Sequence, residues 1–526
     1  LEYTGAENLR LDEKGALHAT TALGSITENA PYSFEEGGRK LESRYTLQDN
    51  TLGFEVKGQS PGTTFTIDPG VVWSTVYRFG NDDYGLAVAT DAAGNIIVCG
   101  GSFESNEGAN FWDVYIRKYT PGGVVLYTVF YQRDVALPHT EFGTIAVDPF
   151  GNIFLAGYKL GGRSFLVKFD NNGSKKWEVS YGGSSGTMAS SVATDATGHV
   201  YVAGTTTSAS NIAGDGHQNT RGGLNDAFLI KFNGSGDKEW GTYYGEGAQD
   251  YGASVAADAT GNVYLSGTTY STGSIADGGH QNTPGGEGDA FLVKFNTNGT
   301  RQWGTYYGGP ALDRGFSIAA DAAGNIYMGG ITKSTSGIAF NGHQNTIGGI
   351  INAFLVKFNQ AGARQWATYF GGNTHDEAIS VTLDNWGNIY MVGENSSGST
   401  VRFNSEGLQV WTTYLPFWPV DVATDPSGNI FVVGSGNSTN SSGRSVYLSK
   451  YAGCQVPTTW YKDTDNDGYS DGTTEVDCTR PANYKLPAEL IETSGDCDDN
   501  NEDLSPATVW YKDGDNDKFS DGTTVS

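Results

Sequence analysis

Basic side chains are scarce in this sequence. Among 526 residues there are 32 Lys and Arg against 59 Asp and Glu, which gives a formal net charge of -27. This charge would repel a nucleic-acid backbone, and the sequence has no basic stripe that could hold one. We therefore expect no nucleic-acid partner, whereas cations remain suitable ligands.

Long apolar runs and cysteines are rare as well. No apolar run approaches the length of a transmembrane helix, and the opening residues LEYTGAENLR do not resemble a signal peptide. Because the first residue is not Met, we expect a processed or trimmed part of a longer polypeptide. Cys454, Cys478 and Cys497 lie within the last 75 residues, which indicates local disulfide chemistry and an oxidising compartment. Cys99, in the apolar run NIIVCGG, is expected to be a buried thiol.

Glycine and aromatic residues are abundant, and one turn sequence recurs seven times. Glycine accounts for 75 residues, beside 29 Tyr, 25 Phe and 11 Trp, a mixture that favours an all-β protein. Each turn resembles DATGNVYL and lies between two short alternating segments, which predicts a hairpin with glycine at positive φ. We expect its first residue to form the turn rather than to catalyse: Asp91, Asp148, Asp195, Asp258, Asp321, Asp384 and Asp425.

Two further strands follow each hairpin, so each copy has the four strands of a propeller blade. The third strand resembles AFLVKFN, and the fourth carries Trp177, Trp240, Trp303, Trp366 and Trp411, with Leu126 in the corresponding place of the first copy. The seventh copy has no fourth strand, whereas an unassigned one around Trp73 precedes the first copy. We therefore predict a seven-bladed β-propeller closed by residues 71–77, because this pairing removes two free edges.

These repeats resemble the bacterial SBBP-type β-propeller proteins over residues 71–451. By that resemblance, residues 1–70 are the C-terminal part of the β-rich domain that precedes such repeats. The resemblance implies a fold and does not specify an activity.

Residues 452–526 form a loop-rich acidic tail with 17 Asp and Glu against 5 Lys and Arg. TTWYKDTDNDGYSDGTT recurs 50 residues later as TVWYKDGDNDKFSDGTT, truncated by the chain end. Acids at alternate positions can surround one Ca²⁺ with hard oxygen ligands. We expect two such sets to bind calcium, namely Asp463, Asp465, Asp467 and Asp471, and Asp513, Asp515, Asp517 and Asp521. The alternative interpretation is a solvated acidic linker.

The tail resembles the calcium-binding repeats of thrombospondin type 3 and of bacterial MopE-like surface proteins. That resemblance implies a third oxygen cluster at Asp496, Asp498, Asn500 and Asp503. We expect Cys478 and Cys497 to pair across a short loop, while the partner of Cys454 is open.

The sequence GHQNT recurs at an interval of 63 residues, with His217, His280 and His343. Equivalent atoms of neighbouring blades are separated by roughly 10 to 20 Å, whereas ligands of one Zn²⁺ lie about 4 Å apart. We therefore expect three copies of one connector, held by His, Gln and Asn side chains, and a regular polar surface that could face a ligand.

A second recurring group is an acid eight residues before the turn Asp. The group consists of Asp83, Asp250, Asp313 and Asp376. These acids could form a ring around a cation or a sugar, but we favour the interpretation that each one caps backbone N–H groups in its own connector.

We carry three hypotheses for function. The leading one is a secreted or bacterial cell-surface scaffold without catalytic activity, whose propeller binds an extracellular glycan or protein and whose tail is a calcium-stiffened stalk. The second is a polysaccharide-active glycosidase or lyase, for which the strongest irregularity is the segment with Arg133, Asp134, His139 and Glu141, although we favour the interpretation of this segment as a variable loop. The third is a passive spacer.

Overall fold

The computed structural model describes most of the central part of the chain and shorter stretches at either end. The described residues are 8–12, 15, 17–21, 24–28, 33–35, 40–48, 51–58, 65–67, 71–106, 109–131, 143–159, 163–183, 186–373, 375–395, 397–437, 443–453, 458–464, 469–470, 472–477, 484–485, 490, 493–494, 510–511 and 524–525. The regular elements in these ranges are all β-strands.

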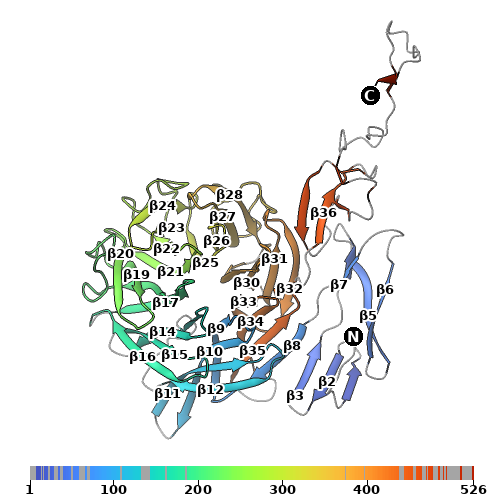
Figure 1. The fold of residues 1–526 in the computed structure, drawn as a ribbon, viewed down its shortest axis with the longest axis horizontal. Coiled ribbons are helices and arrows are strands. Elements are labelled where there is room, and N and C mark those ends of the chain that lie inside the picture. The colour runs from blue at the N-terminus through green and yellow to red at the C-terminus, as the bar shows by residue number, and fades with distance from the viewer. Residues whose placement is uncertain are drawn as a thin grey trace. The chain divides into compact units, whose positions relative to one another are not determined.

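Seven four-stranded antiparallel sheets form a β-propeller, as predicted (Figure 1). The first strands are β9 (Asp82–Thr90), β13 (Thr144–Val147), β17 (Thr187–Thr194), β21 (Asp250–Ala257), β25 (Asp313–Ala320), β29 (Ser380–Leu383) and β33 (Trp418–Thr424). The second strands are β10 (Ile96–Asn106), β14 (Ile153–Lys159), β18 (Val200–Thr206), β22 (Val263–Thr269), β26 (Ile326–Thr332), β30 (Ile389–Asn395) and β34 (Ile430–Asn437). First strands of neighbouring blades contact one another.

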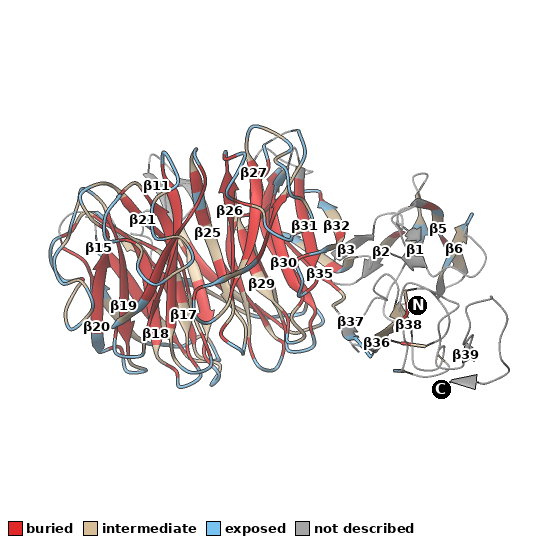
Figure 2. Cartoon of the chain, turned by 90° about the horizontal axis from the view of Figure 1, so that it is seen from above, coloured by how far each residue is buried: buried red, intermediate tan, exposed pale blue. Residues whose placement is uncertain are grey.

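The third strands are β11 (Ala109–Tyr119), β15 (Arg163–Phe169), β19 (Asp226–Phe232), β23 (Asp289–Phe295), β27 (Asn352–Phe358), β31 (Ser397–Phe403) and β35 (Arg444–Tyr451). The fourth strands are β12 (Val125–Tyr131), β16 (Lys175–Tyr181), β20 (Lys238–Tyr244), β24 (Arg301–Tyr307), β28 (Arg364–Phe370), β32 (Gln409–Leu415) and β8 (Val71–Tyr77). The second and third strands of blades 3 to 5 are almost wholly buried (Figure 2).

The seventh blade takes its fourth strand from the start of the propeller. β8 pairs antiparallel with β35, so that Thr75 lies opposite Leu448. This confirms the predicted closure by residues 71–77.

The recurring Asp organises each hairpin turn, as predicted. Asp258 accepts hydrogen bonds from the Thr260 and Asn262 backbone N–H groups, at 2.9 and 3.0 Å, and from the Tyr264 hydroxyl at 3.0 Å. Gly261 completes that turn with φ of 82°, a backbone conformation that glycine adopts without strain.

One strand position in the first blade was predicted wrongly. Lys118 on β11 lies opposite Tyr127, at the register where Lys294 in blade 4 faces Trp303. Tyr127, and not Leu126, therefore replaces the recurring tryptophan, because the chain alternates faces at every residue. Leu126 is exposed.

By contacts between residues, the chain divides into two compact units. One comprises Leu1–Leu17, Asn29–Asp68 and Cys454–Ser526, and the other comprises His18–Glu28 and Pro69–Gly453. The strands before the propeller are β1 (Asn8–Leu11), β2 (Leu17–Thr21), β3 (Gly24–Glu28), β4 (Ser33–Glu35), β5 (Lys40–Gln48), β6 (Thr51–Lys57) and β7 (Phe65–Ile67). Those after it are β36 (Thr458–Lys462), β37 (Thr474–Asp477), β38 (Tyr484–Lys485), β39 (Trp510–Tyr511) and β40 (Thr524–Val525).

Candidate functional site

The three GHQNT loops connect the second and third strands of blades 3, 4 and 5. Each loop runs along the fourth strand of its own blade, through bridges such as Gly214 to Gly241 and Asp277 to Gly304. The glutamine amides of the loops donate to the carbonyl two residues on, at 2.9 to 3.0 Å. The asparagine amides donate to the carbonyl three residues back, at 2.9 to 3.3 Å. These bonds fix the loop, as the sequence predicts for Gln and Asn.

The histidine rings have a different role from the one predicted for them. The His217 ring lies 6.5 Å from Tyr244 of its own blade and 6.2 Å from Phe295 of the next, between ring centroids. His280 repeats the contact with Phe358 of the following blade, at 6.3 Å. The rings of His217 and His280 therefore pack across blade junctions, and all three histidines, His343 included, are exposed to solvent.

Burial lowers the pKa of His217, and the nearby Arg301 guanidinium lowers it further. The pKa of His280 is lowered in the same way, by burial and then by Arg364. Both imidazoles are therefore neutral at pH 7, so that each can donate and accept one hydrogen bond.

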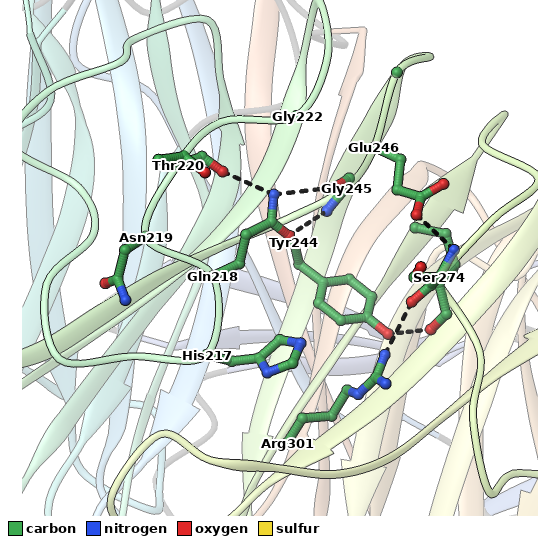
Figure 3. A pocket seen from close by; sticks show the side chains of 12 residues that line it. His217, Gln218, Asn219, Thr220, Gly222, Tyr244, Gly245, Glu246, Ser274 and Arg301 are labelled. Atoms are coloured by element: carbon green, nitrogen blue, oxygen red, sulfur yellow. Dashed lines mark hydrogen bonds between the residues drawn. The ribbon is translucent and has the colours of Figure 1, made fainter.

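A groove of about 680 Å³ opens beside His217, at the junction of blades 3 and 4 (Figure 3). Arg301 lies on one side and donates to the Ser274 carbonyl at 2.9 Å. Glu246 lies opposite and accepts from the Ser274 backbone N–H at 2.6 Å. The buried Tyr244 hydroxyl donates to the Ile275 carbonyl. Cationic, anionic and neutral polar groups thus share one concave surface.

The next junction repeats most of this arrangement. The Tyr307 hydroxyl donates to the Ile338 carbonyl at 2.8 Å, and Arg364 donates to the same oxygen at 3.1 Å. Gly309 stands where the first groove has Glu246, so the acidic side is particular to the junction of blades 3 and 4.

The three histidines do not meet at a metal. Within the described ranges, no three His, Cys, Asp or Glu side chains are close enough to hold one ion.

The acids that precede the turn cap their connectors, as predicted. Asp250, Asp313 and Asp376 accept from the backbone N–H four residues earlier, at 2.9, 2.7 and 3.0 Å. Asp83 accepts from Gly80 N–H at 3.1 Å. All four side chains are buried, and burial raises the pKa of each.

Asp421, which was not predicted from the sequence, joins three blades at the point of closure. Its carboxylate accepts from the Ser380 hydroxyl of blade 6 at 2.6 Å and from the Val88 N–H of blade 1 at 2.9 Å. Burial raises its pKa to about 6. The sequence does contain a signal for this residue: blades 2 to 6 have Ser or Thr four residues before the turn Asp, whereas blade 7 has Asp421 at that position.

Cys99 lies nearby as a fully buried thiol, as predicted, and burial raises its pKa.

In the tail, Asp463 is the single predicted calcium ligand within the described residues. Its side chain is buried, and neither carboxylate oxygen has a hydrogen-bond partner among the described residues. The Lys485 ammonium lies 3.7 Å away. Predicted ligands outside the described residues are Asp465, Asp467, Asp471, Asp496, Asp498, Asn500, Asp503, Asp513, Asp515, Asp517 and Asp521. Cys478 and Cys497, and the segment with Arg133, Asp134, His139 and Glu141, also lie outside them.

Two family profiles match parts of the chain. Residues 239–273 and 417–440 match the family described as beta-propeller repeat, SBBP. Residues 1–70 match a domain of unknown function, DUF7948. The SBBP match agrees with the blades seen in the structure.

Three individual proteins align with parts of the chain. An uncharacterized WD repeat-containing protein of Acanthamoeba polyphaga mimivirus is 23% identical over 393 residues, which cover 63% of this chain and 26% of that protein. The chain thus spans about a quarter of the length of this curated relative. A protein of unknown function from Bacteroides caccae aligns at 11% identity and a TM-score of 0.35, over 64% of this chain and 94% of that one. BamB from Moraxella catarrhalis aligns at 12% identity and a TM-score of 0.34, over 71% and 98%.

Among the described residues, no helix has the length and apolar character needed to cross a membrane.

Proposed function

We propose that this protein is a secreted or bacterial cell-surface binding protein without catalytic activity, and that its propeller is the interaction module. The observation that carries the proposal is the groove beside His217, most of whose arrangement recurs at the following blade junction. A groove whose tyrosine and arginine recur at the next blade junction suits an extended ligand made of similar units.

The groove chemistry favours a polar extracellular glycan or a protein segment. Arg301, the neutral His217 and Asn219 supply hydrogen-bond donors, while Glu246 and Thr220 supply acceptors. Sugar hydroxyls and peptide amides require such a mixture of donors and acceptors. The same loops expose apolar side chains, with Leu224 67% and Ile350 84% exposed, which could pack against a ligand.

A binding screen tests this proposal. The full chain would be applied to a glycan array and to host-surface preparations, with calcium and with EDTA. Arg301→Ala and Glu246→Gln should weaken retention of the ligand found, whereas Lys176→Ala, at a half-exposed side chain on β16, should not. Turnover of a bound polysaccharide would contradict the non-catalytic reading, and equal binding by all variants would contradict the groove.

We also propose that the tail binds calcium and acts as a stiffened stalk. A buried carboxylate without hydrogen-bond partners is costly, and Asp463 has this environment among the described residues, with the Lys485 ammonium 3.7 Å away as an ion-pair partner. A cation in direct contact with the carboxylate would stabilise it further. Asp463, with the three acids that follow at its spacing, would hold the ion. Calcium would supply the positive charge that lets this acidic segment order.

A further inference from the structure

Two buried carboxylates approach each other where blade 4 meets blade 5. Asp289 begins β23 and Asp313 begins β25, and the side chains are 1% and 0% exposed. A Cβ placed on Gly308 would lie 2.0 Å from Asp289 Oδ1 and 2.7 Å from Asp313 Oδ2, so these two oxygens are less than about 5 Å apart. Glycine at position 308 thus leaves open the space between them.

The hydrogen bonds that the structure describes at this junction leave two carboxylate oxygens unused, Asp289 Oδ1 and Asp313 Oδ1. Asp289 Oδ2 accepts from the Gly285 N–H at 2.9 Å, whereas Asp289 Oδ1 has no hydrogen-bond partner among the described residues. Asp313 Oδ2 accepts from the Gly309 N–H at 2.7 Å and from the Ser334 hydroxyl at 2.8 Å. Of the two unused oxygens, Asp289 Oδ1 is the one that lies beside Asp313 Oδ2 at Gly308.

Among the described residues, no basic side chain forms an ion pair with these two acids. Burial and, to a lesser extent, the Asp313 charge raise the pKa of Asp289 to about 6, although the Gly285 and Gly286 N–H groups act in the opposite direction. Asp313 is likewise raised by burial, and the groups that oppose this are hydroxyl and backbone donors. Two like charges buried this close together need either a shared proton or a cation.

The preceding junction provides an internal comparison, because all of its corresponding oxygens are used. Asp226, the counterpart of Asp289, accepts from the Gly222 and Gly223 N–H groups, at 2.6 and 2.9 Å, one on each oxygen. Asp250 accepts from the Thr269 and Ser271 hydroxyls at 2.5 and 2.8 Å. Unused carboxylate oxygens therefore distinguish the junction of Asp289 and Asp313 from the junction that precedes it.

We infer that Asp289 and Asp313 bind a hard divalent cation, such as Ca²⁺, between blades 4 and 5. Two carboxylates, with the buried Ser334 hydroxyl beside them, form an oxygen-rich environment of the kind that Ca²⁺ prefers. The ion would tie the third strand of one blade to the first strand of the next. This site is separate from the tail and from the groove.

Ion counting on the full chain tests the inference. Wild type, Asp289→Asn and the matched control Asp226→Asn would be equilibrated with Ca²⁺ at pH 7, separated from free ion and measured for bound calcium per chain. The tail contributes equally to all three proteins. We expect Asp289→Asn to bind one ion fewer than wild type, and Asp226→Asn to bind the same number as wild type. Equal counts in wild type and Asp289→Asn, or an equal loss in both variants, would overturn the inference.

A position-specific measurement covers the case in which Asp289→Asn does not fold. Crystals of the wild-type chain soaked in Mn²⁺ should show an anomalous-scattering peak between the two carboxylates. Density without such a peak, together with uptake of one proton by the pair, would show a shared proton and refute the cation site. Neither result depends on whether the groove binds a glycan.

Discussion

The indole N–H of Trp303 donates to the backbone carbonyl oxygen of Gln360 at 3.0 Å, from the fourth strand of blade 4 to a turn in blade 5. Trp177, Trp240 and Trp366 make the same bond to the blade that follows each of them. The Trp303 indole also covers Gly362, where a Cβ would lie 2.8 Å from the ring. The recurring tryptophan is therefore a tie between blades.

Trp303→Phe should lower the free energy of unfolding by about 1–3 kcal/mol, because it removes the N–H donor, part of a buried ring and the partner of the Gln360 carbonyl. Chemical denaturation followed by circular dichroism measures this loss. Trp418→Phe is the control, since Trp418 is 43% exposed. If both variants lose the same free energy of unfolding, the hydrogen bond between blades does not contribute measurably to stability.

Asp258→Ala should destabilise the propeller by about 2–3 kcal/mol, because the turn loses an acceptor for two backbone N–H groups and for the Tyr264 hydroxyl. Asp258→Asn should cost less, since its amide oxygen still accepts. The control is Asp237→Ala, at an exposed side chain in another turn, and it should lie within about 0.5 kcal/mol of wild type. Denaturant midpoints compare the three, and an Asn variant as unstable as the Ala variant would contradict the acceptor role.

The sequence predicts the blades better than it predicts the junctions between them. Turn residues and alternating strands are local signals, so the seven blades and their closing strand could be read directly. Tyr127 was missed because choosing it over Leu126 requires the strand register. The contacts of His217 with Phe295, and of Asp289 with Asp313, join different blades, and no local pattern encodes how close such side chains come.

Asp421 should make the propeller less stable as pH rises from about 4 to 6. Its pKa is raised to about 6 in the folded state, so the folded chain holds a proton that the unfolded chain has already lost in this window. Unfolding would then become easier by on the order of 1–2 kcal/mol across the window, after allowance for partial exposure. Asp421→Asn keeps an acceptor oxygen and should remove this dependence. The measurement is the difference in unfolding free energy between the two proteins from pH 4 to 7, and a difference that stays constant would contradict the expectation.

Removal of calcium should expose the tail to proteases. If a calcium ion contacts the buried Asp463 carboxylate, EDTA leaves that carboxylate with the Lys485 ammonium as its cationic partner, and residues 452–526 should be cleaved faster while the propeller persists. Asp463→Asn removes one charged ligand, so the calcium concentration that gives half-protection should rise by about 10- to 100-fold. Asp277→Asn is the matched control, because Asp277 is an acid of the propeller with 81% side-chain exposure, and its protection curve should overlay that of wild type. Mass spectrometry of the fragments locates the cuts. Equal cleavage with calcium and with EDTA would mean that the acidic repeats are a solvated linker, since an ion that orders the segment must change its cleavage rate.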